Sequence, residues 1–178
     1  MSYCEFFQDG VGGNSPVNHS PFAKTAMDRR RILERYRRIA MVGLSSNPFR
    51  PSHFAAVYLI AEGYDVTPVN PRESEVLGRR CYATLAEVPD PIEVVDIFRE
   101  PAAVPEIVEQ AIARQAKVVW MQLGVVHEEA AARAREAGLE VVMDRCMKIE
   151  HARFFGGLST IGLNTGVISA VRRPRPAR

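Results

Sequence analysis

The sequence of 178 residues predicts an α/β fold, a doubly wound parallel sheet of five strands with helices on both faces. Two observations lead to this prediction. Short, almost continuously apolar runs alternate with longer segments of helical periodicity, as expected for buried parallel strands joined by crossover helices. Gly63 and Gly138 directly follow two of the helical segments, where helices commonly end. The expected strand order, numbered along the chain, is 3-2-1-4-5, as in a Rossmann-like fold.

The elements follow one another in a regular order. A helix is expected at 25–37, because Thr25 followed three residues later by Asp28 is typical of a capping box. Strands are expected at 39–43, 65–69, 93–98, 117–123 and 139–143, and helices at 52–62, 102–114 and 128–137. Residues 71–89 interrupt this pattern, with only a short helix near 83–87 and a turn at Gly78. Ligands of such sheets bind beyond the carboxyl ends of the strands.

Composition limits the class of protein. Hydrophobic residues make up 47% of the chain and the net charge is only +2, so any anion site must be local. The arginines of the first helix are interpreted as a solvated face in preference to a nucleic-acid surface. Three widely spaced cysteines, no signal peptide and no long apolar run predict a reduced, cytoplasmic protein without a membrane span.

Three regions are expected along the chain. Residues 1–23 are rich in Gly, Asn, Ser and Pro and predict a flexible N-terminal arm, whose aromatic residues leave open a contact with another copy or another protein. Residues 24–151 form the expected nucleotide-binding domain. Residues 152–178 form a C-terminal extension, first rich in Gly and then in Arg and Pro.

The loop after the first strand is suited to hold a phosphate. Gly43 is followed by Ser45, Ser46 and Asn47, and then by Pro51, a residue favoured at the first position of a helix. The free N–H groups and positive dipole end of that helix attract anions. Only one glycine of the Gly-x-Gly-x-x-Gly dinucleotide fingerprint is present, so a plain tight turn remains an alternative on these residues alone.

The end of the second strand narrows the choice of ligand. NAD enzymes usually place a carboxylate there, but here the sequence is Val69-Asn70-Pro71-Arg72. A guanidinium suits a phosphate on the adenosine ribose, which NADP carries on the 2′ oxygen and coenzyme A on the 3′ oxygen. The missing glycines and the short stretch after Cys146, expected to be too small for a substrate domain, favour coenzyme A over NADP.

No catalytic residue and no metal site are assigned from the sequence. His53 could donate to a phosphate or serve as a polar residue of the first helical turn. His127, just before a helix, is interpreted as a cap. Cys146 stands beside Arg145 and Lys148, which favour a thiolate, although a partly buried structural cysteine is the preferred interpretation. Asp96, within the third strand, is interpreted as structural.

From about residue 39 to 151 the sequence resembles the coenzyme A-binding domain family, small bacterial proteins similar to the nucleotide-binding domain of the succinyl-CoA synthetase alpha subunit. The resemblance lies in the segments IAMVGLSSNPFRPSH, YLIAEGYDVTPVNPR, EVLGRRCYATLAEVPDPIEVVDIFRE and VVWMQLGVVHEEAAARAREAGLEVVMDRCMKIEH. The tail FFGGLSTIGLNTG also looks like the end of some members.

The resemblance implies a site for each part of coenzyme A. The pyrophosphate would be cradled by Gly43, Ser45, Ser46, Asn47 and Arg50. The adenosine would be lined by Val69, Asn70 and Pro71, with Arg72 on the 3′-phosphate. Ile97 and Phe98 would form an apolar wall, and Gln122 and Gly124 would border the pantetheine. The catalytic histidine domain of the synthetase has no counterpart here, so its phosphoryl transfer is not expected.

Three functions follow as hypotheses. The first is a coenzyme A or acyl-CoA binding protein that acts without catalysis as a carrier, sensor or regulatory module. The second is an NADP-dependent oxidoreductase. The third is a protein-interaction module with a vestigial nucleotide site.

Overall fold

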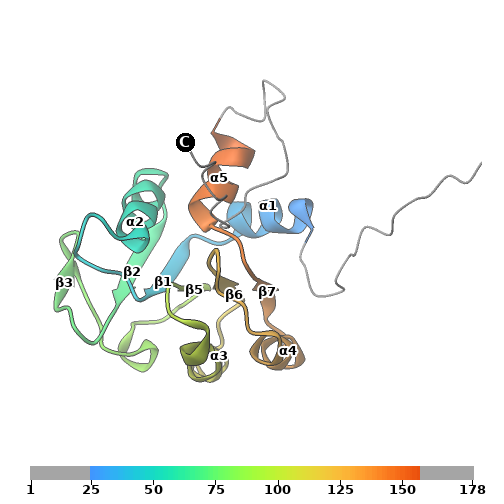
Figure 1. Cartoon of the computed structure of the whole chain (residues 1–178). Helices are drawn as coiled ribbons and strands as arrows, with labels where there is room; N and C mark the ends of the chain where they lie inside the picture. The colour runs from blue at the N-terminus through green and yellow to red at the C-terminus, as the bar shows by residue number, and fades with distance from the viewer. Residues whose placement is uncertain (1–24, 157–178) are drawn as a thin grey trace, which may run out of the picture.

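The computed structural model describes residues 25–156 and shows a parallel sheet covered by helices on both faces (Figure 1). The α/β class and its five parallel strands are therefore confirmed. The strands are β1 (Arg38–Val42), β2 (Asp65–Val69), β5 (Val94–Ile97), β6 (Val118–Met121) and β7 (Glu140–Val142). The expected N-terminal arm, the extension from residue 157 onward and most of the tail FFGGLSTIGLNTG lie outside the described residues.

The expected strand order is wrong. The sheet runs β2-β1-β5-β6-β7, which is 2-1-3-4-5 in the numbering used above for the strands. The third strand pairs with the free side of the first, with Met41 opposite Asp96, and does not lie outside the second strand. The chain therefore adds β2 on one side of β1 and the later strands on the other side, and the switch point lies between β1 and β5.

The segment between β2 and β5 explains this order. Its apolar residues Leu85, Val88 and Ile92 join the core on one face of the sheet, whereas α2 (Pro51–Ala61) packs on the opposite face. Connections between parallel strands are right-handed. A connection that lies on the opposite face of the sheet from the one before it therefore adds the next strand in the opposite direction along the sheet. The chain therefore passes back beyond β1 before it forms β5.

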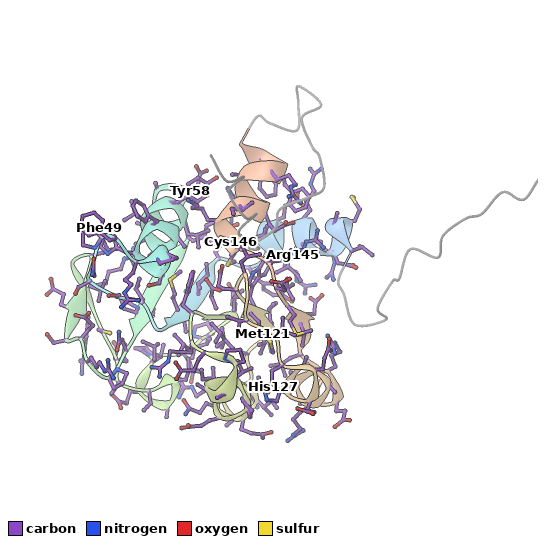
Figure 2. All side chains as sticks on the ribbon, in the orientation of Figure 1. Phe49, Tyr58, Met121, His127, Arg145 and Cys146 are labelled. Carbon is purple, nitrogen blue, oxygen red and sulfur yellow. The ribbon has the colours of Figure 1, made fainter. Side chains whose placement is uncertain are left out.

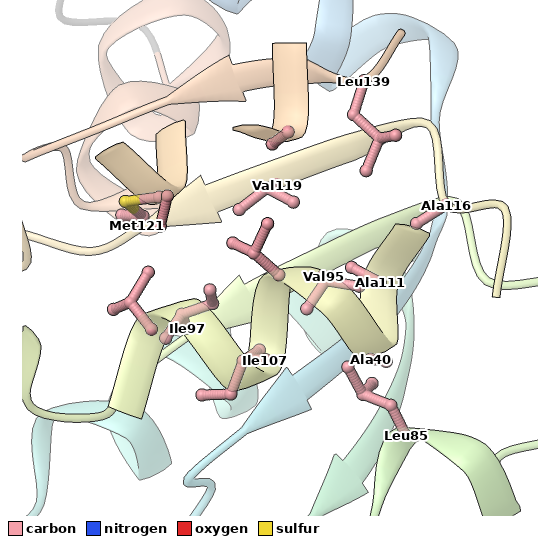
Figure 3. Close-up of a cluster of buried hydrophobic side chains, with 14 of the residues drawn as sticks. Ala40, Leu85, Val95, Ile97, Ile107, Ala111, Ala116, Val119, Met121 and Leu139 are labelled. Atoms are coloured by element: carbon pink, nitrogen blue, oxygen red, sulfur yellow. The ribbon is translucent and has the colours of Figure 1, made fainter. Parts of the chain in front are cut away.

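Alternating side chains of the strands divide the core into two layers. Val119 and Met121 point to the layer under α3 (Val104–Ala113) and α4 (Glu128–Glu136), shown in Figure 3. Val118 and Trp120 point to the layer under α2, α1 (Ala26–Arg35) and α5 (Met147–Phe155). Because both faces are covered, strand residues of either parity are apolar, which is why the strands read as continuous apolar runs.

The segment that interrupted the pattern holds small elements. A two-stranded antiparallel hairpin, β3 (Glu75–Val76) and β4 (Arg79–Arg80), turns at Gly78 and was not expected from the sequence. The short helix expected near 83–87 is a single 3₁₀ turn, η1 (Leu85–Glu87). A second such turn, η2 (Pro101–Ala103), precedes α3, which begins two residues later than expected.

Helix α1 begins as expected, with Thr25 and Asp28 forming a capping box. Its arginines are mostly paired with acids rather than simply solvated. Arg29 contacts Glu150 of α5, Arg30 contacts Glu34, and Arg31 contacts Glu140 of β7. The Arg29 and Arg31 pairs fasten α1 to α5 and to the sheet, whereas the Arg30 pair lies within the helix.

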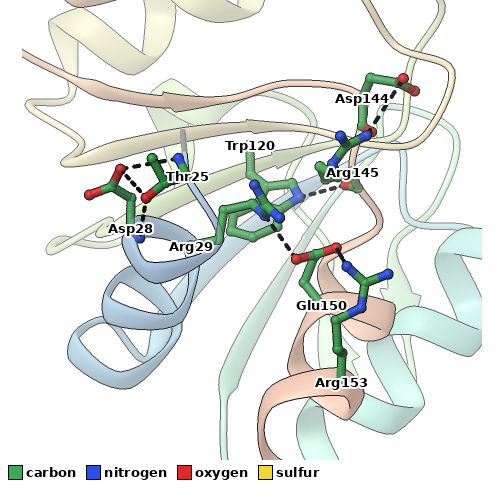
Figure 4. A network of polar contacts seen from close by, with 8 residues as sticks. All are labelled: Thr25, Asp28, Arg29, Trp120, Asp144, Arg145, Glu150 and Arg153. Carbon is green, nitrogen blue, oxygen red and sulfur yellow. Dashed lines mark hydrogen bonds and ion pairs between the residues drawn. The ribbon is translucent and has the colours of Figure 1, made fainter. Parts of the chain in front are cut away.

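Helix α5 was not expected, and it spans the expected domain boundary between residues 151 and 152. Its Glu150 is 2% exposed and accepts from Arg29 Nε at 2.8 Å and from an Arg153 guanidinium nitrogen at 3.1 Å, as Figure 4 shows. Trp120 Nε1 donates to the carbonyl oxygen of Arg145 at 2.7 Å, just before the helix. These contacts place the start of α5 over the carboxyl end of the sheet.

Candidate functional site

A cleft of about 1090 Å³ opens at the switch point, beyond the carboxyl ends of β1 and β5. Helices α2 and α5 begin on either side of it. Pro51, the first residue of α2, and Cys146, the residue before α5, both line its walls. Figure 2 shows Phe49 and Cys146 on the two sides of α2, with Cys146 where α5 begins. The cleft is thus placed where ligands of doubly wound sheets bind.

The cleft brings together about half of the residues selected from the sequence. Those that line it are Gly43, Ser45, Arg50, Asn70, Arg72, Phe98 and Gln122. The selected residues that do not line it are Ser46, Asn47, Val69, Pro71, Ile97 and Gly124. Val69 and Ile97 are buried strand residues of the core, and Gly124 donates its N–H to Asp144 in the neighbouring loop.

Gly43 sets the distance between the first loop and β5. It has a φ of +89°, and a Cβ atom at this position would lie 2.6 Å from the carbonyl oxygen of Phe98. Its N–H donates to Val69 at 2.8 Å, which holds the start of the loop against β2. Only glycine allows this backbone conformation and this close approach together, so the glycine has a structural reason beyond a plain tight turn.

The rest of the loop is held by its own polar groups. The Ser45 hydroxyl accepts from Asn47 N–H at 3.2 Å, and the Asn47 side chain accepts from Phe49 N–H at 2.9 Å. His53 Nδ1 lies 3.0 Å from the carbonyl oxygen of Ser45, so His53 serves to bind this loop to the first turn of α2. Pro51 is at the first helical position, as expected, and no side chain caps the helix.

Glu73 is a cleft residue that the sequence analysis missed. Its Oε1 accepts from both the N–H and the hydroxyl of Ser46, at 3.1 and 2.8 Å, and so ties the first loop to the loop after β2. These are donors that the family resemblance assigns to a pyrophosphate. An anion bound here would have to compete with the Glu73 carboxylate for Ser46.

The charge of the cleft is nevertheless positive. Four basic side chains and two acidic side chains line it: Arg50, Arg72, Arg99 and Lys148, against Glu73 and Glu100. Arg99 lies 3.5 Å from Glu100. Within residues 25–156, Arg72 is exposed and its guanidinium forms no ion pair, while its backbone N–H donates to Asn70 Oδ1 at 3.1 Å. The cleft therefore concentrates positive charge locally, as the sequence analysis required for an anion site.

Asn70 fixes the loop that carries Arg72. Its side-chain nitrogen donates to the carbonyl oxygen of Leu44 at 2.9 Å, and its oxygen accepts from Arg72 N–H. The first two loops are thereby joined across the ends of β1 and β2. This position follows directly from strand pairing, because β1 and β2 are parallel neighbours.

The floor of the cleft contains Gln122, which is 3% exposed. Its Nε2 donates to Asp96 Oδ1 at 2.7 Å, and the second carboxyl oxygen of Asp96 is buried without a hydrogen-bond partner among residues 25–156. Burial raises the pKa of Asp96 to about 7, against the opposing effect of the Gln122 and Ile97 hydrogen bonds. A carboxyl group that titrates near neutral pH thus lies directly behind the cleft.

Cys146 lies in the wall of the cleft, at the residue before α5. Burial raises the pKa of its thiol, and the nearby charge of Asp96 adds a smaller effect in the same direction. Arg145 turns away and donates to the carbonyl oxygen of Asp144 at 2.7 Å. Backbone hydrogen bonds of Ile149 and Lys148 and the Lys148 charge oppose this rise in pKa, and the structural interpretation of Cys146 stays a prediction.

The loop before α2, α2 itself and α5 supply apolar cleft residues that the sequence gave no reason to select. Phe49, Phe54 and Ile149 form apolar parts of its lining, and Phe49 is 87% exposed. The exposed phenylalanines beside a predicted phosphate loop could have been recognised as a signal. Ile149 could not, because α5 itself was not predicted.

None of the three histidines within residues 25–156 lines the cleft. His127 caps α4 as expected, with its Nδ1 accepting from Ala130 N–H at 3.2 Å. His151 packs between aromatic rings, and its Nδ1 lies 3.0 Å from the Tyr58 hydroxyl. Within the described residues, no group of three or more metal-ligating side chains is found.

Comparison with known proteins gives consistent matches. The sequence model of the family described as "CoA binding domain" matches residues 37–152. The uncharacterized protein YneT of Bacillus subtilis (strain 168) is 41% identical over 121 residues, which cover 68% of this chain and 90% of that protein. A solved structure of a hypothetical protein from Pyrococcus horikoshii OT3 is 50% identical, with a TM-score of 0.72 over 74% of this chain and 93% of that chain.

A larger protein shares the same unit. The dinucleotide-forming acetyl-coenzyme A synthetase 1 of Ca. Korarchaeum cryptofilum, solved with phosphate and ADP, is 25% identical with a TM-score of 0.55. The match covers 61% of this chain but only 26% of the synthetase.

Within residues 25–156 there is no helix long and apolar enough to span a lipid bilayer.

Proposed function

This chain belongs to the CoA binding domain family, and on this basis we propose that it binds coenzyme A or an acyl-CoA in the cleft between α2 and α5. The observation that carries the proposal is Arg72, an exposed guanidinium at the end of β2, where the adenosine ribose of a nucleotide would lie. A guanidinium there matches the 3′-phosphate that distinguishes coenzyme A from NAD.

The cleft supports the rest of the ligand. Helices α2 and α5 both begin at it, so the positive ends of two helix dipoles point toward a bound anion. Arg50 and Lys148 add positive charge beside them. We assign the pyrophosphate to this region, the adenosine to Asn70 and its loop, and the pantetheine to the floor at Phe98 and Gln122.

We further propose that the protein acts as a carrier, sensor or regulatory module rather than as an enzyme. The arrangement of the cleft supports this. His53 is used to hold a loop, His127 caps a helix, and the Cys146 thiol has a raised pKa. A nucleophile paired with a base is not found among the described residues of the cleft, and Arg72 contributes binding rather than proton transfer.

Replacement of Arg72 tests the proposal. For Arg72→Ala we expect coenzyme A to bind roughly ten- to a hundredfold more weakly, because a charge-assisted contact of about 1.5–3 kcal/mol is lost. Dephospho-coenzyme A, which lacks the 3′-phosphate, should bind the wild-type protein weakly and should lose almost nothing further in the variant. Isothermal titration calorimetry with both ligands measures the four dissociation constants.

The matched control is Arg133→Ala, which removes the same charge from α4. This helix contributes no residue to the cleft lining, and Arg133 pairs there with Glu109. It should leave the affinity for coenzyme A unchanged. Equal affinities for coenzyme A and dephospho-coenzyme A in the wild-type protein would remove the role of Arg72. Tighter binding of NADPH than of coenzyme A would replace the proposed ligand altogether.

A further inference from the structure

Asp96 is placed in the interior of the sheet, where an ionisable side chain is costly. It lies in β5 between Met41 of β1 and Trp120 of β6, and it is 0% exposed. Its neighbours Val95 and Ile97 face the α3 and α4 layer, so its side chain faces the layer under α2 and α5, on the side of the cleft. Burying an incompletely bonded carboxylate here costs free energy that an apolar residue would not.

The contacts of Asp96 are few and specific. Oδ1 accepts from Gln122 Nε2 at 2.7 Å, and Oδ2 is buried without a hydrogen-bond partner among residues 25–156. An ionised carboxylate can only accept, so it dictates that the nitrogen end of the Gln122 amide faces it. Because Gln122 lines the cleft, the oxygen of its amide is then the atom that faces the cleft.

The charged groups around Asp96 do not neutralise it. Helix α5, packed over this layer, carries Glu150, which is bound to Arg29 and Arg153. It also carries Lys148, and the thiol of Cys146 precedes it; both of these residues line the cleft. His53 of α2 is bound to the Ser45 carbonyl oxygen. Because burial raises the pKa of Asp96 to about 7, its charge changes within the ordinary range of cellular pH.

Building on the proposed function, we infer that Gln122, oriented by Asp96, distinguishes the thiol of free coenzyme A from the thioester of an acyl-CoA. When Asp96 is ionised, the Gln122 oxygen faces the cleft and accepts from the S–H of free coenzyme A. When Asp96 is protonated, its O–H donates to the Gln122 oxygen, and the amide turns its N–H groups to the cleft, where they donate to the thioester carbonyl.

Free coenzyme A and acyl-CoA differ in the hydrogen-bonding group that they present to the Gln122 amide. A thiol offers a hydrogen to an acceptor, whereas a thioester carbonyl offers only lone pairs. An oxygen facing a carbonyl oxygen leaves both without a partner, so each orientation of Gln122 disfavours one ligand. Gln122 is a specificity residue in this account, and Asp96 is a positioning residue that acts through it. The expected difference in affinity between the two ligands corresponds to one ordinary hydrogen bond, about three- to tenfold.

The test measures the ratio of the dissociation constants of acetyl-CoA and coenzyme A at about pH 6 and about pH 8, on either side of the Asp96 pKa. Both ligands carry the same phosphates, so the ratio cancels the titration of those groups. In the wild-type protein we expect the preference to shift toward acetyl-CoA by about three- to tenfold as the pH falls. In Asp96→Asn, which cannot change its charge, the ratio should be the same at both pH values.

Gln122→Met serves as a second variant, because it keeps the length of the side chain and removes the amide. Its ratio should also be independent of pH while Asp96 is still present. A wild-type ratio that does not change with pH, or one that changes equally in Asp96→Asn, overturns the inference but leaves coenzyme A binding intact. If neither ligand binds the wild-type protein at either pH, the proposed function fails, and the inference fails with it.

Discussion

At the scale of single residues, Asp96 has a consequence for stability that does not depend on any ligand. Its pKa is about 7 in the folded protein, above the ordinary value of 3.8, so the folded state holds this proton more tightly than the unfolded chain. Its contribution to stability is therefore fully present below about pH 4 and is lost as the pH rises to about 7. Above that pH the folded protein carries the full cost of a buried charge.

We expect Asp96→Asn to remove this pH dependence. At about pH 8 the variant should be more stable than the wild-type protein, by up to about 4 kcal/mol, and at about pH 4 the two should differ little. Urea unfolding of both proteins at the two pH values measures the difference. A stability difference that is the same at both would show that the carboxyl group of Asp96 does not titrate in this range.

Gly43 provides a second prediction at this scale. In Gly43→Ala the new methyl group meets the carbonyl oxygen of Phe98 at 2.6 Å, and the residue is also held at a φ of +89°. Gly138 has a φ of +87° but no atom within 4 Å of an added Cβ, so Gly138→Ala isolates the backbone strain, about 1–2 kcal/mol. We expect Gly43→Ala to lose clearly more stability than this control in thermal unfolding, and also to bind coenzyme A more weakly. Equal losses would mean that the loop moves away from β5 without cost.

At the scale of elements, the contact between α1 and α5 depends on Glu150. This carboxylate is 2% exposed between Arg29 and Arg153, whose side chains are 11% and 14% exposed. Neutralising the buried carboxylate takes its charge from both guanidinium groups, and breaking a buried charged pair typically costs about 3–5 kcal/mol. We therefore expect Glu150→Gln to lower the free energy of unfolding by about this amount in urea.

Glu34 offers the matched control for that measurement. It pairs with Arg30 within α1, but both side chains are about half exposed. Glu34→Gln should therefore change stability by less than about 1 kcal/mol. If the two variants lose the same amount, α5 is not held in place by its buried carboxylate, and the wall of the cleft rests on apolar packing alone.

At the scale of the whole molecule, the cleft joins segments that are far apart in the described chain, from Gly43 to Ile149. Its walls come from the loops after β1, β2, β5 and β6 and from the first turns of α2 and α5. A ligand that contacts all of these segments binds only the folded state. A ligand at about 100 times its dissociation constant then adds about 2.7 kcal/mol of stability.

We expect coenzyme A at that concentration to raise the melting temperature by roughly 5–10 °C, as calculated for a domain of this size. Differential scanning fluorimetry with coenzyme A, acetyl-CoA and NADPH compares the candidate ligands on one scale. The same concentration of coenzyme A should raise the melting temperature of Arg72→Ala much less. A rise of equal size for both proteins would mean that the ligand does not contact Arg72.

Much of the secondary structure could be predicted because it depends on local patterns. Buried strands such as β6 are nearly continuous in apolar residues, and Thr25 with Asp28 marks the start of α1. Helix α5 escaped prediction because two of its buried residues, Glu150 and His151, are polar. Glu150 can be buried because Arg29, from the other end of the described chain, pairs with it together with Arg153 of α5 itself, and His151 can be buried because aromatic rings surround it.

The sequence by itself determined the fold class, the loop at Gly43 and the arginine at the end of β2, because each rests on residues that are close together in the chain. Tertiary structure alone decided that β5 lies beside β1, that Glu73 binds Ser46, and that Asp96 orients Gln122. The reason is physical. The face of the sheet that a right-handed crossover covers decides on which side of a strand the next strand is added. Side chains many positions apart in the chain can pair only once their strands lie side by side.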